Sequence, residues 1–270
     1  MTSARKSALP FADAALKGSA ALWFAVAATG QFIFAAYIAL NYGRKAFGGN
    51  FAGWSETLIH GIVAGDPVGN AAVALHLLLA LVITVGGPLQ LIPAVRRRLP
   101  RLHRWNGRIY ITVAFVISLG GLYMVWTRGV LGPTVNAVAI SINALLIMGC
   151  AAMALRLALR RDFDRHRRWA TRLFLVANGV WFFRVGLMFW VLANGGKPVG
   201  LGDALDGPVA LILGFATYLL PLAIYELYLR TQDRAGAAGR VGMAALLVVL
   251  SLATAVGVFG AAVGMWLPRL

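Results

Sequence analysis

Charged side chains are scarce in this 270-residue chain and make up only 13% of it. Soluble globular domains have about 25% charged and 45–50% apolar residues. This chain is 60% hydrophobic, with a mean hydropathy of +0.77. So few charges cannot cover a core with a polar surface, which excludes an ordinary soluble domain, and so many apolar residues exclude intrinsic disorder. The composition therefore predicts an integral membrane protein.

Cysteine and several catalytic motifs are also missing. Cys150 is the one cysteine of the chain, so no disulfide can form within it. The sequence has no GxxxxGK motif followed by Ser or Thr, and no GxSxG, HExxH or CxxC motif. No lysine lies within an expected membrane span, as a retinal Schiff base would require. The sequence thus gives no support to these chemistries.

Seven apolar stretches are each long enough to cross a membrane, which takes about 20 residues. They cover about residues 20–40, 69–92, 105–126, 134–159, 170–193, 208–229 and 242–266. The first is too long for the apolar part of a signal peptide, so we expect it to be retained. No linker rich in Pro, Gly or Ser divides the chain. We expect an all-α bundle of seven transmembrane helices that forms a single domain over residues 1–270.

The basic residues are distributed unevenly. The chain has 25 Lys and Arg residues against nine Asp and Glu residues, which gives a net charge of +16. Most of the cations precede the first span or lie in the second, fourth and sixth loops. The other loops and the C-terminus hold Arg44, Lys45, Arg128, Lys197 and Arg269. Because cytoplasmic loops collect positive charge, we expect a multi-pass protein of the bacterial inner membrane with its N-terminus inside and its C-terminus outside.

This placement also bears on partners. The basic loops are too short to form a nucleic-acid domain, so we expect anionic lipid headgroups at the cytoplasmic face and no nucleic acid. A membrane-protein partner and a homo-oligomer both stay open.

The longest outer loop, residues 41–68, has apolar residues at helical spacing. They are Trp54, Leu58, Ile59 and Ile62. This spacing predicts a short amphipathic helix on the outer membrane surface, and Gly65-Asp66-Pro67 predicts its end.

Two basic segments form a weak repeat, in which Trp105 and Trp169 are 64 residues apart. In each copy a His precedes the Trp, an Arg lies three residues after the Trp, and an aromatic residue lies five residues after it. These residues are His103, Arg108 and Tyr110 in the first copy and His166, Arg172 and Phe174 in the second. The pattern predicts parallel helical hairpins. An equally open interpretation is an interfacial belt, with Trp at headgroup level and Arg on lipid phosphates.

Arg184 lies well inside the fifth apolar stretch, where a charge costs at least about 2.5–3.5 kcal/mol. Glu226 is the one carboxylate within a span, but it is expected near the cytoplasmic end and to pair with Arg230. We therefore expect backbone carbonyls, polar groups or a bound anion around Arg184. His76 has a similar expected depth, which suggests either a shared site with Arg184 or a hydrogen-bonded core histidine.

His103 and His166 begin the third and fifth helices at matching depth. Two imidazoles from separate helices can supply both axial ligands of a haem b, and Arg108 and Arg172 could pair with its propionates. Their position before the apolar runs also fits the interfacial belt. Gln90 follows Gly86-Gly87-Pro88 in a helix-breaking segment, where it could satisfy a freed carbonyl or contact a ligand.

The segments around these residues, in this order, resemble a bacterial family of predicted membrane proteins, domain of unknown function 2306. The motifs are His76, Gly86-Gly87-Pro88-Leu89-Gln90, the basic run 96–101, His103-Arg104-Trp105-Asn106-Gly107-Arg108 and His166-Arg167-Arg168-Trp169-Ala170-Thr171-Arg172. The resemblance covers about residues 70–190. It implies a multi-pass membrane protein with no established activity, and it carries over no reaction.

Two functions follow as hypotheses. The first is a membrane redox component that binds haem b or a quinone through the histidines and arginines. The alternative is a non-redox transporter or a protein that binds lipid or a small anion through Arg184 and His76, or an accessory subunit without a ligand. Whether the chain is an enzyme stays open.

Overall fold

The computed structural model describes residues 2–58 and 60–270, and in that part of the chain all regular structure is helical. The first part contains α1 (Thr2–Tyr37), a π-helical segment η1 (Ile38–Gly43), α2 (Arg44–Phe47), a 3-10 turn η2 (Ala52–Glu56), α3 (Pro67–Leu91), α4 (Pro93–Arg98) and α5 (Pro100–Thr127). The second contains α6 (Thr134–Leu159), α7 (Phe163–Ala177), α8 (Gly179–Ala193), α9 (Pro208–Arg234), α10 (Ala237–Ala261), a π-helical segment η3 (Ala262–Trp266) and a 3-10 turn η4 (Leu267–Arg269).

Six helices are long and apolar enough to cross a membrane, and there are seven spans if α7 and α8 count as one bent span. The all-helical, multi-span architecture predicted from composition is confirmed. The first and last candidate spans, Leu9–Phe47 and Ala237–Arg269, extend beyond the stretches expected at 20–40 and 242–266. Beyond residue 40 the first span gains length from the end of η1 and from α2, and beyond residue 266 the last span gains length from the 3-10 turn η4.

The structure divides the span expected at 170–193 into two helices, because α7 and α8 meet at an angle of 57°. Asn178 lies between them with non-helical backbone angles, and its side-chain amide donates to the Phe174 carbonyl at 2.7 Å. The next residue, Gly179, faces Asn143 of α6 so closely that a Cβ would lie 2.6 Å from the Asn143 amide nitrogen. Asparagine and glycine thus provide the break and the close approach that a bent span needs.

The prediction of an amphipathic helix in the loop 41–68 is wrong. The chain there forms η1, α2 and η2 and then continues without a helix, and Ile59 of the expected apolar face lies outside the described residues. Trp54 is only 4% exposed and donates its indole N–H to the Tyr42 carbonyl at 3.0 Å. Leu58 and Ile62 pack against the same buried cluster. These side chains turn inward because the aromatic end of α1 offers them a protein surface.

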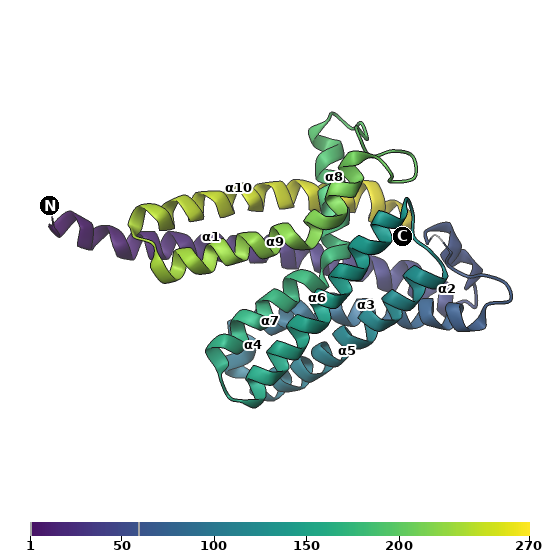
Figure 1. Cartoon of the computed structure of the whole chain (residues 1–270), viewed down its shortest axis with the longest axis horizontal. Coiled ribbons are helices and arrows are strands. Elements are labelled where there is room, and N and C mark those ends of the chain that lie inside the picture. Colours follow the sequence, from purple (N-terminus) through teal and green to yellow (C-terminus); the bar gives the residue numbers. More distant parts are fainter. Residues whose placement is uncertain (1, 59) are drawn as a thin grey trace.

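The helices form two arms that meet at one end of the molecule (Figure 1). One arm consists of α1, α9 and α10, which run side by side toward the N-terminus, and Arg240 of α10 pairs there with Asp13 of α1. The other arm consists of α3 to α7. Helix α8 lies where the arms join and packs on α9 and α10. The free ends of both arms carry the basic segments, and we call this side of the molecule the basic end. The opposite side, which contains the loops 43–66, 128–133 and 194–207, is called the loop end.

Each arm has its own buried core. At the junction, Phe34, Trp181, Val258 and Trp266 form the centre of a cluster from α1, α8, α10 and η3, which Val73 of α3 joins. In the second arm, Ile83, Tyr110, Ile147 and Leu173 pack together with Tyr218 of α9. Helix α3 therefore contributes to both cores and connects the arms.

Candidate functional site

A partly open cavity of about 430 Å³ lies between the arms, bounded by α1, α7, α8, α9 and α10. Its walls are mostly apolar and include Trp23, Leu175, Phe182 and Leu247. The hydroxyls of Thr217 and Thr254 also belong to the lining, but each donates to a carbonyl of its own helix. These threonines therefore present little hydrogen-bonding capacity to the cavity, which suits an apolar ligand.

Two tyrosines form the polar part of this cavity. Tyr225 and Tyr228 lie in the second half of α9, toward the basic end, with ring centroids 6.3 Å apart. The Arg172 guanidinium carbon lies 5.7 Å from the Tyr225 ring centroid. The cavity thus combines a long apolar wall with two phenol groups beside a cation.

Two ion pairs connect α7 with α9 beside these tyrosines. The Arg172 guanidinium donates to both Glu226 oxygens at 2.6 and 2.9 Å, and Arg168 donates to both Asp233 oxygens at 2.7 and 2.8 Å. The pair expected between Glu226 and Arg230 is therefore replaced by one between helices. Arg172 faces α9 from α7, so Glu226 neutralises its charge across the helix interface. Residue spacing along a single helix could not reveal this pair.

The two repeat copies share a local contact but differ in burial. The Arg108 guanidinium carbon lies 5.1 Å from the Trp105 ring centroid, and that of Arg172 lies 4.8 Å from the Trp169 ring centroid. Trp105 is 62% exposed and Arg108 is exposed, whereas Arg172 is held by Glu226. The exposed first copy is compatible with the interfacial-belt interpretation, while Trp169 and Arg172 of the second copy are half-buried at the contact of α7 with α9.

The three candidate histidine ligands occupy different places. The His166 ring Nδ1 lies 2.9 Å from the Ala154 carbonyl oxygen, so this nitrogen carries the proton and Nε2 stays available. The Nδ1 atoms of His103 and His76 are buried and have no hydrogen-bond partner in the described part of the chain. His76 faces Gly121 of α5, and none of the three histidines lines the cavity. Their assignment to a cofactor stays a prediction.

Gln90 lies in the contact between α3 and α5. Its amide donates to the His103 carbonyl at 2.9 Å, and Asn106 donates to the Gly86 carbonyl at the same distance. At Gly87 a Cβ would lie 2.9 Å from the Phe174 ring of α7. The glycines and amides of this segment therefore hold three helices in close contact. Gln90 donates to a carbonyl of α5 and not to one freed in α3 by Pro88, so both of its expected roles stay predictions.

Arg184 lies one and a half turns into α8, at the junction of the arms. Its Nη1 donates to the Val180 carbonyl at 3.3 Å, and its guanidinium carbon lies 5.4 Å from the Phe34 ring centroid. No hydrogen bond, ion pair or aromatic contact among residues 2–58 and 60–270 joins Arg184 to His76. A site shared by these two residues stays a prediction without a contact to support it.

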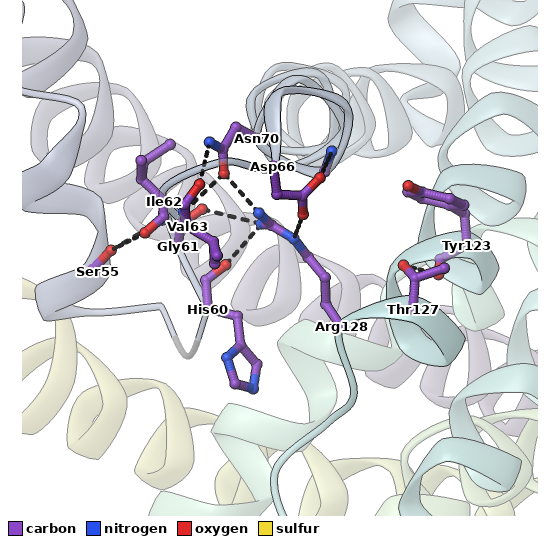
Figure 2. A network of polar contacts seen from close by, with 11 residues as sticks. Ser55, His60, Gly61, Ile62, Val63, Asp66, Asn70, Tyr123, Thr127 and Arg128 are labelled. Atoms are coloured by element: carbon purple, nitrogen blue, oxygen red, sulfur yellow. Dashed lines mark hydrogen bonds and ion pairs between the residues drawn. The ribbon is translucent and has the colours of Figure 1, made fainter.

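Sequence reasoning missed the role of Arg128, which it treated only as a loop cation. Figure 2 shows its guanidinium at the centre of a network at the loop end: it donates to Asp66 at 3.0 Å, to Asn70 at 2.6 Å and to the His60 carbonyl at 2.9 Å. Asp66 also caps α3 by accepting from the Gly69 N–H at 2.8 Å. The cap residue before Pro67 was the signal in the sequence, because an Asp at that position is a common start of a helix.

Comparison with known proteins adds a family and no activity. A family model described as a predicted membrane protein, DUF2306, matches residues 73–229, which run from α3 to α9. Neither the curated proteins nor the solved structures give a significant match. The matched region includes the close contact of α3 with α5 and the Arg172–Glu226 pair.

Proposed function

The chain belongs to the DUF2306 family of predicted membrane proteins, and from this premise we propose that it binds a membrane-soluble lipid with a long apolar chain and a small polar head. An isoprenoid quinone is the redox-active form of such a ligand. The observation that carries the proposal is the apolar cavity between the two arms. Its volume of about 430 Å³ lies within the range of small-molecule sites, roughly 300–1,000 Å³.

The lining supports an amphiphile over a polar substrate. The apolar walls match a hydrocarbon or isoprenoid chain, which enters from the bilayer without crossing water. Tyr225 and Tyr228 supply phenol groups at the end toward the basic segments, where a carbonyl or hydroxyl head could form hydrogen bonds. The histidines do not line the cavity, so this proposal does not depend on a haem.

We also place the protein in the bacterial inner membrane, with the basic end in the cytoplasm. The arginines of α4 and those at the start of α7 lie together at the free end of one arm (Figure 1). Anionic lipid headgroups are the partners that such an end would bind. In this orientation the tyrosines of the cavity lie toward the cytoplasmic leaflet.

Quenching of tryptophan fluorescence by a benzoquinone with a ten-carbon tail tests the ligand, because Trp23 lines the cavity. We expect saturable quenching of the purified protein in nanodiscs. Ala253→Phe places a ring in the cavity and should weaken the affinity at least tenfold. The control Leu252→Phe changes the neighbouring residue, which is 63% exposed on the outside of the same helix. This variant should leave the quinone affinity unchanged.

Equal quinone affinity in the wild type and Ala253→Phe would contradict the proposal. Native mass spectrometry separates the two lipid classes: a phospholipid retained by the wild type and lost from Ala253→Phe would identify a phospholipid as the occupant. A Soret band in the purified protein that disappears in His103→Ala and His166→Ala would instead support the haem hypothesis.

A further inference from the structure

We propose that Arg184 is the anchor of a second site, which binds an anionic group such as a carboxylate or phosphate at the junction of the arms. This site is distinct from the apolar cavity, because Val185 and Gly186 line that cavity and Arg184 does not. The proposal rests on an uncompensated cation and on buried donors that share one cluster with it.

The charge of Arg184 has no counter-ion in the described part of the chain. The ion pairs among residues 2–58 and 60–270 involve other cations, and the one hydrogen bond from the guanidinium goes to the Val180 carbonyl. A guanidinium has five N–H donors, so most of its capacity is left for another partner. An uncompensated charge inside a membrane span marks a functional site by default.

Unpartnered donors surround the same cluster. Gln31 is completely buried, and within residues 2–58 and 60–270 neither atom of its side-chain amide has a hydrogen-bond partner. The indole N–H groups of Trp181 and Trp266, each side chain 1% exposed, also lack partners. Buried polar groups are nearly always satisfied, so three in one cluster indicate that something else satisfies them.

Contacts connect these donors with Arg184. The Phe34 ring lies beneath the guanidinium at 5.4 Å and 5.1 Å from the Trp266 ring centroid. Trp181 packs against Gly30, where a Cβ would lie 2.8 Å from its ring. Gln31 follows Gly30 and shares the buried face of α1 with Phe34, three residues on. The four nitrogen-bearing side chains therefore belong to one region of α1, α8 and η3.

The balance of donors and acceptors selects the ligand class. Among these four side chains, an arginine, an amide and two indoles contribute N–H groups, and the Gln31 oxygen is the one acceptor. The Tyr37 and Tyr42 hydroxyls of the same cluster can donate or accept. A cation or an apolar ligand would leave these donors unsatisfied. An anionic oxygen group accepts several hydrogen bonds at once and neutralises the guanidinium.

The backbone around this cluster is unusual in the same place. The π-helical segments η1 and η3 end α1 and α10 at the loop end, and η3 also contacts α1. Single π-helical turns occur often at functional sites. Here η1 allows Tyr42 to approach Tyr37, with hydroxyl oxygens 3.4 Å apart, and Thr57 donates to the Tyr42 hydroxyl at 3.1 Å. These hydroxyls adjoin the cluster around Arg184, because the Tyr37 ring stacks on the Phe34 ring with centroids 6.1 Å apart.

The test uses the full-length protein in nanodiscs of phosphatidylcholine, with inorganic phosphate as the probe. We expect phosphate to change the tryptophan emission saturably and to raise the unfolding temperature. Arg184→Gln and Gln31→Leu should each weaken phosphate binding at least tenfold. Lys197→Gln removes an exposed cation at the same end of the molecule and should have no effect.

A second arm distinguishes a free anion from a lipid headgroup. If phosphatidylglycerol in the nanodisc competes with phosphate and the competition is lost in Arg184→Gln, the site takes anionic headgroups; without competition it takes free anions. No saturable response to either probe, or an equal response in wild type and Arg184→Gln, would overturn the proposal. Because Gln31→Leu keeps the Arg184 charge, its result stands even if Arg184→Gln fails to fold. Phosphate binding that persists in Ala253→Phe shows the two sites to be independent.

Discussion

At the scale of single residues, three arginines of this protein have three different chemical settings. Arg172 is paired with Glu226 between helices, Arg128 binds side chains and carbonyls of the loop end, and Arg184 has one weak contact with a carbonyl. Composition treats all three as positive charges. Their partners come from other helices and loops, so only the folded chain separates a structural arginine from one available to a ligand.

The pair of Asp66 with Arg128 makes a specific pH dependence testable. Hydrogen bonds from the Gly69 N–H and from Arg128 lower the pKa of the Asp66 carboxyl below its ordinary value. A lowered pKa in the folded state stabilises the protein above the unfolded pKa, about 3.9, and this contribution is lost as the pH falls through the folded value.

We therefore expect Asp66→Asn to unfold at a lower temperature than the wild type at pH 7. Asn can still cap α3, so the difference reports the charge of Asp66. Thermal unfolding from pH 7 to pH 3 should show the difference shrinking below about pH 4. A difference that stays constant over this range would contradict the assignment.

At the scale of helices, the break between α7 and α8 shapes the molecule. It directs α8 toward α9 and α10, while α7 packs mainly on α6 and also touches α9 (Figure 1). The cavity uses residues from both sides of the break, including Leu175 before it and Phe182 after it. Leu175 and Phe182 are seven residues apart and would share one face of a straight helix, so the bend changes the direction of the cavity wall between them.

Close packing at Gly179 gives the break a direct test. Gly179→Ala brings a Cβ to 2.6 Å from the Asn143 amide nitrogen. Because this atom ends a side chain that can turn away, we expect a cost at the low end of overpacking, about 1 kcal/mol. The double variant Gly179→Ala with Asn143→Ala should recover most of this loss in the unfolding free energy.

The matched control is Gly149→Ala, because a Cβ at this position in α6 meets nothing within 4 Å. It should be neutral or slightly stabilising. Strictly additive effects of Gly179→Ala and Asn143→Ala would show that the two residues do not touch.

At the scale of the whole molecule, the arms and loops divide the chain into a basic end and a loop end. The second, fourth and sixth loops, which hold most of the cations, lie at the free ends of the arms (Figure 1). The helices therefore place the charges as the distribution along the sequence predicted. Which end faces the cytoplasm is a question for experiment.

Cysteine labelling in cells tests which end of the molecule faces the cytoplasm. The method suits this protein because Cys150 is the one native cysteine and is buried. In a Cys150→Ala background, a membrane-impermeant maleimide should label Lys197→Cys of the loop end in intact cells. It should label Ala94→Cys at the start of α4 only after lysis, since basic loops stay inside. The reverse pattern of labelling would overturn the proposed orientation.

The sequence by itself determined the membrane class, the all-helical fold, the family and most helix boundaries, because hydrophobicity and charge act locally along the chain. The middle spans agree closely: α6 covers Thr134–Leu159 as expected, and α3 ends within one residue of its predicted end. Only the tertiary structure decided the bend at Asn178, the inward packing of Trp54, the Arg172–Glu226 pair and the cavity between the arms. Each of these depends on which side chains from distant segments meet, and hydropathy and spacing contain no information about such contacts.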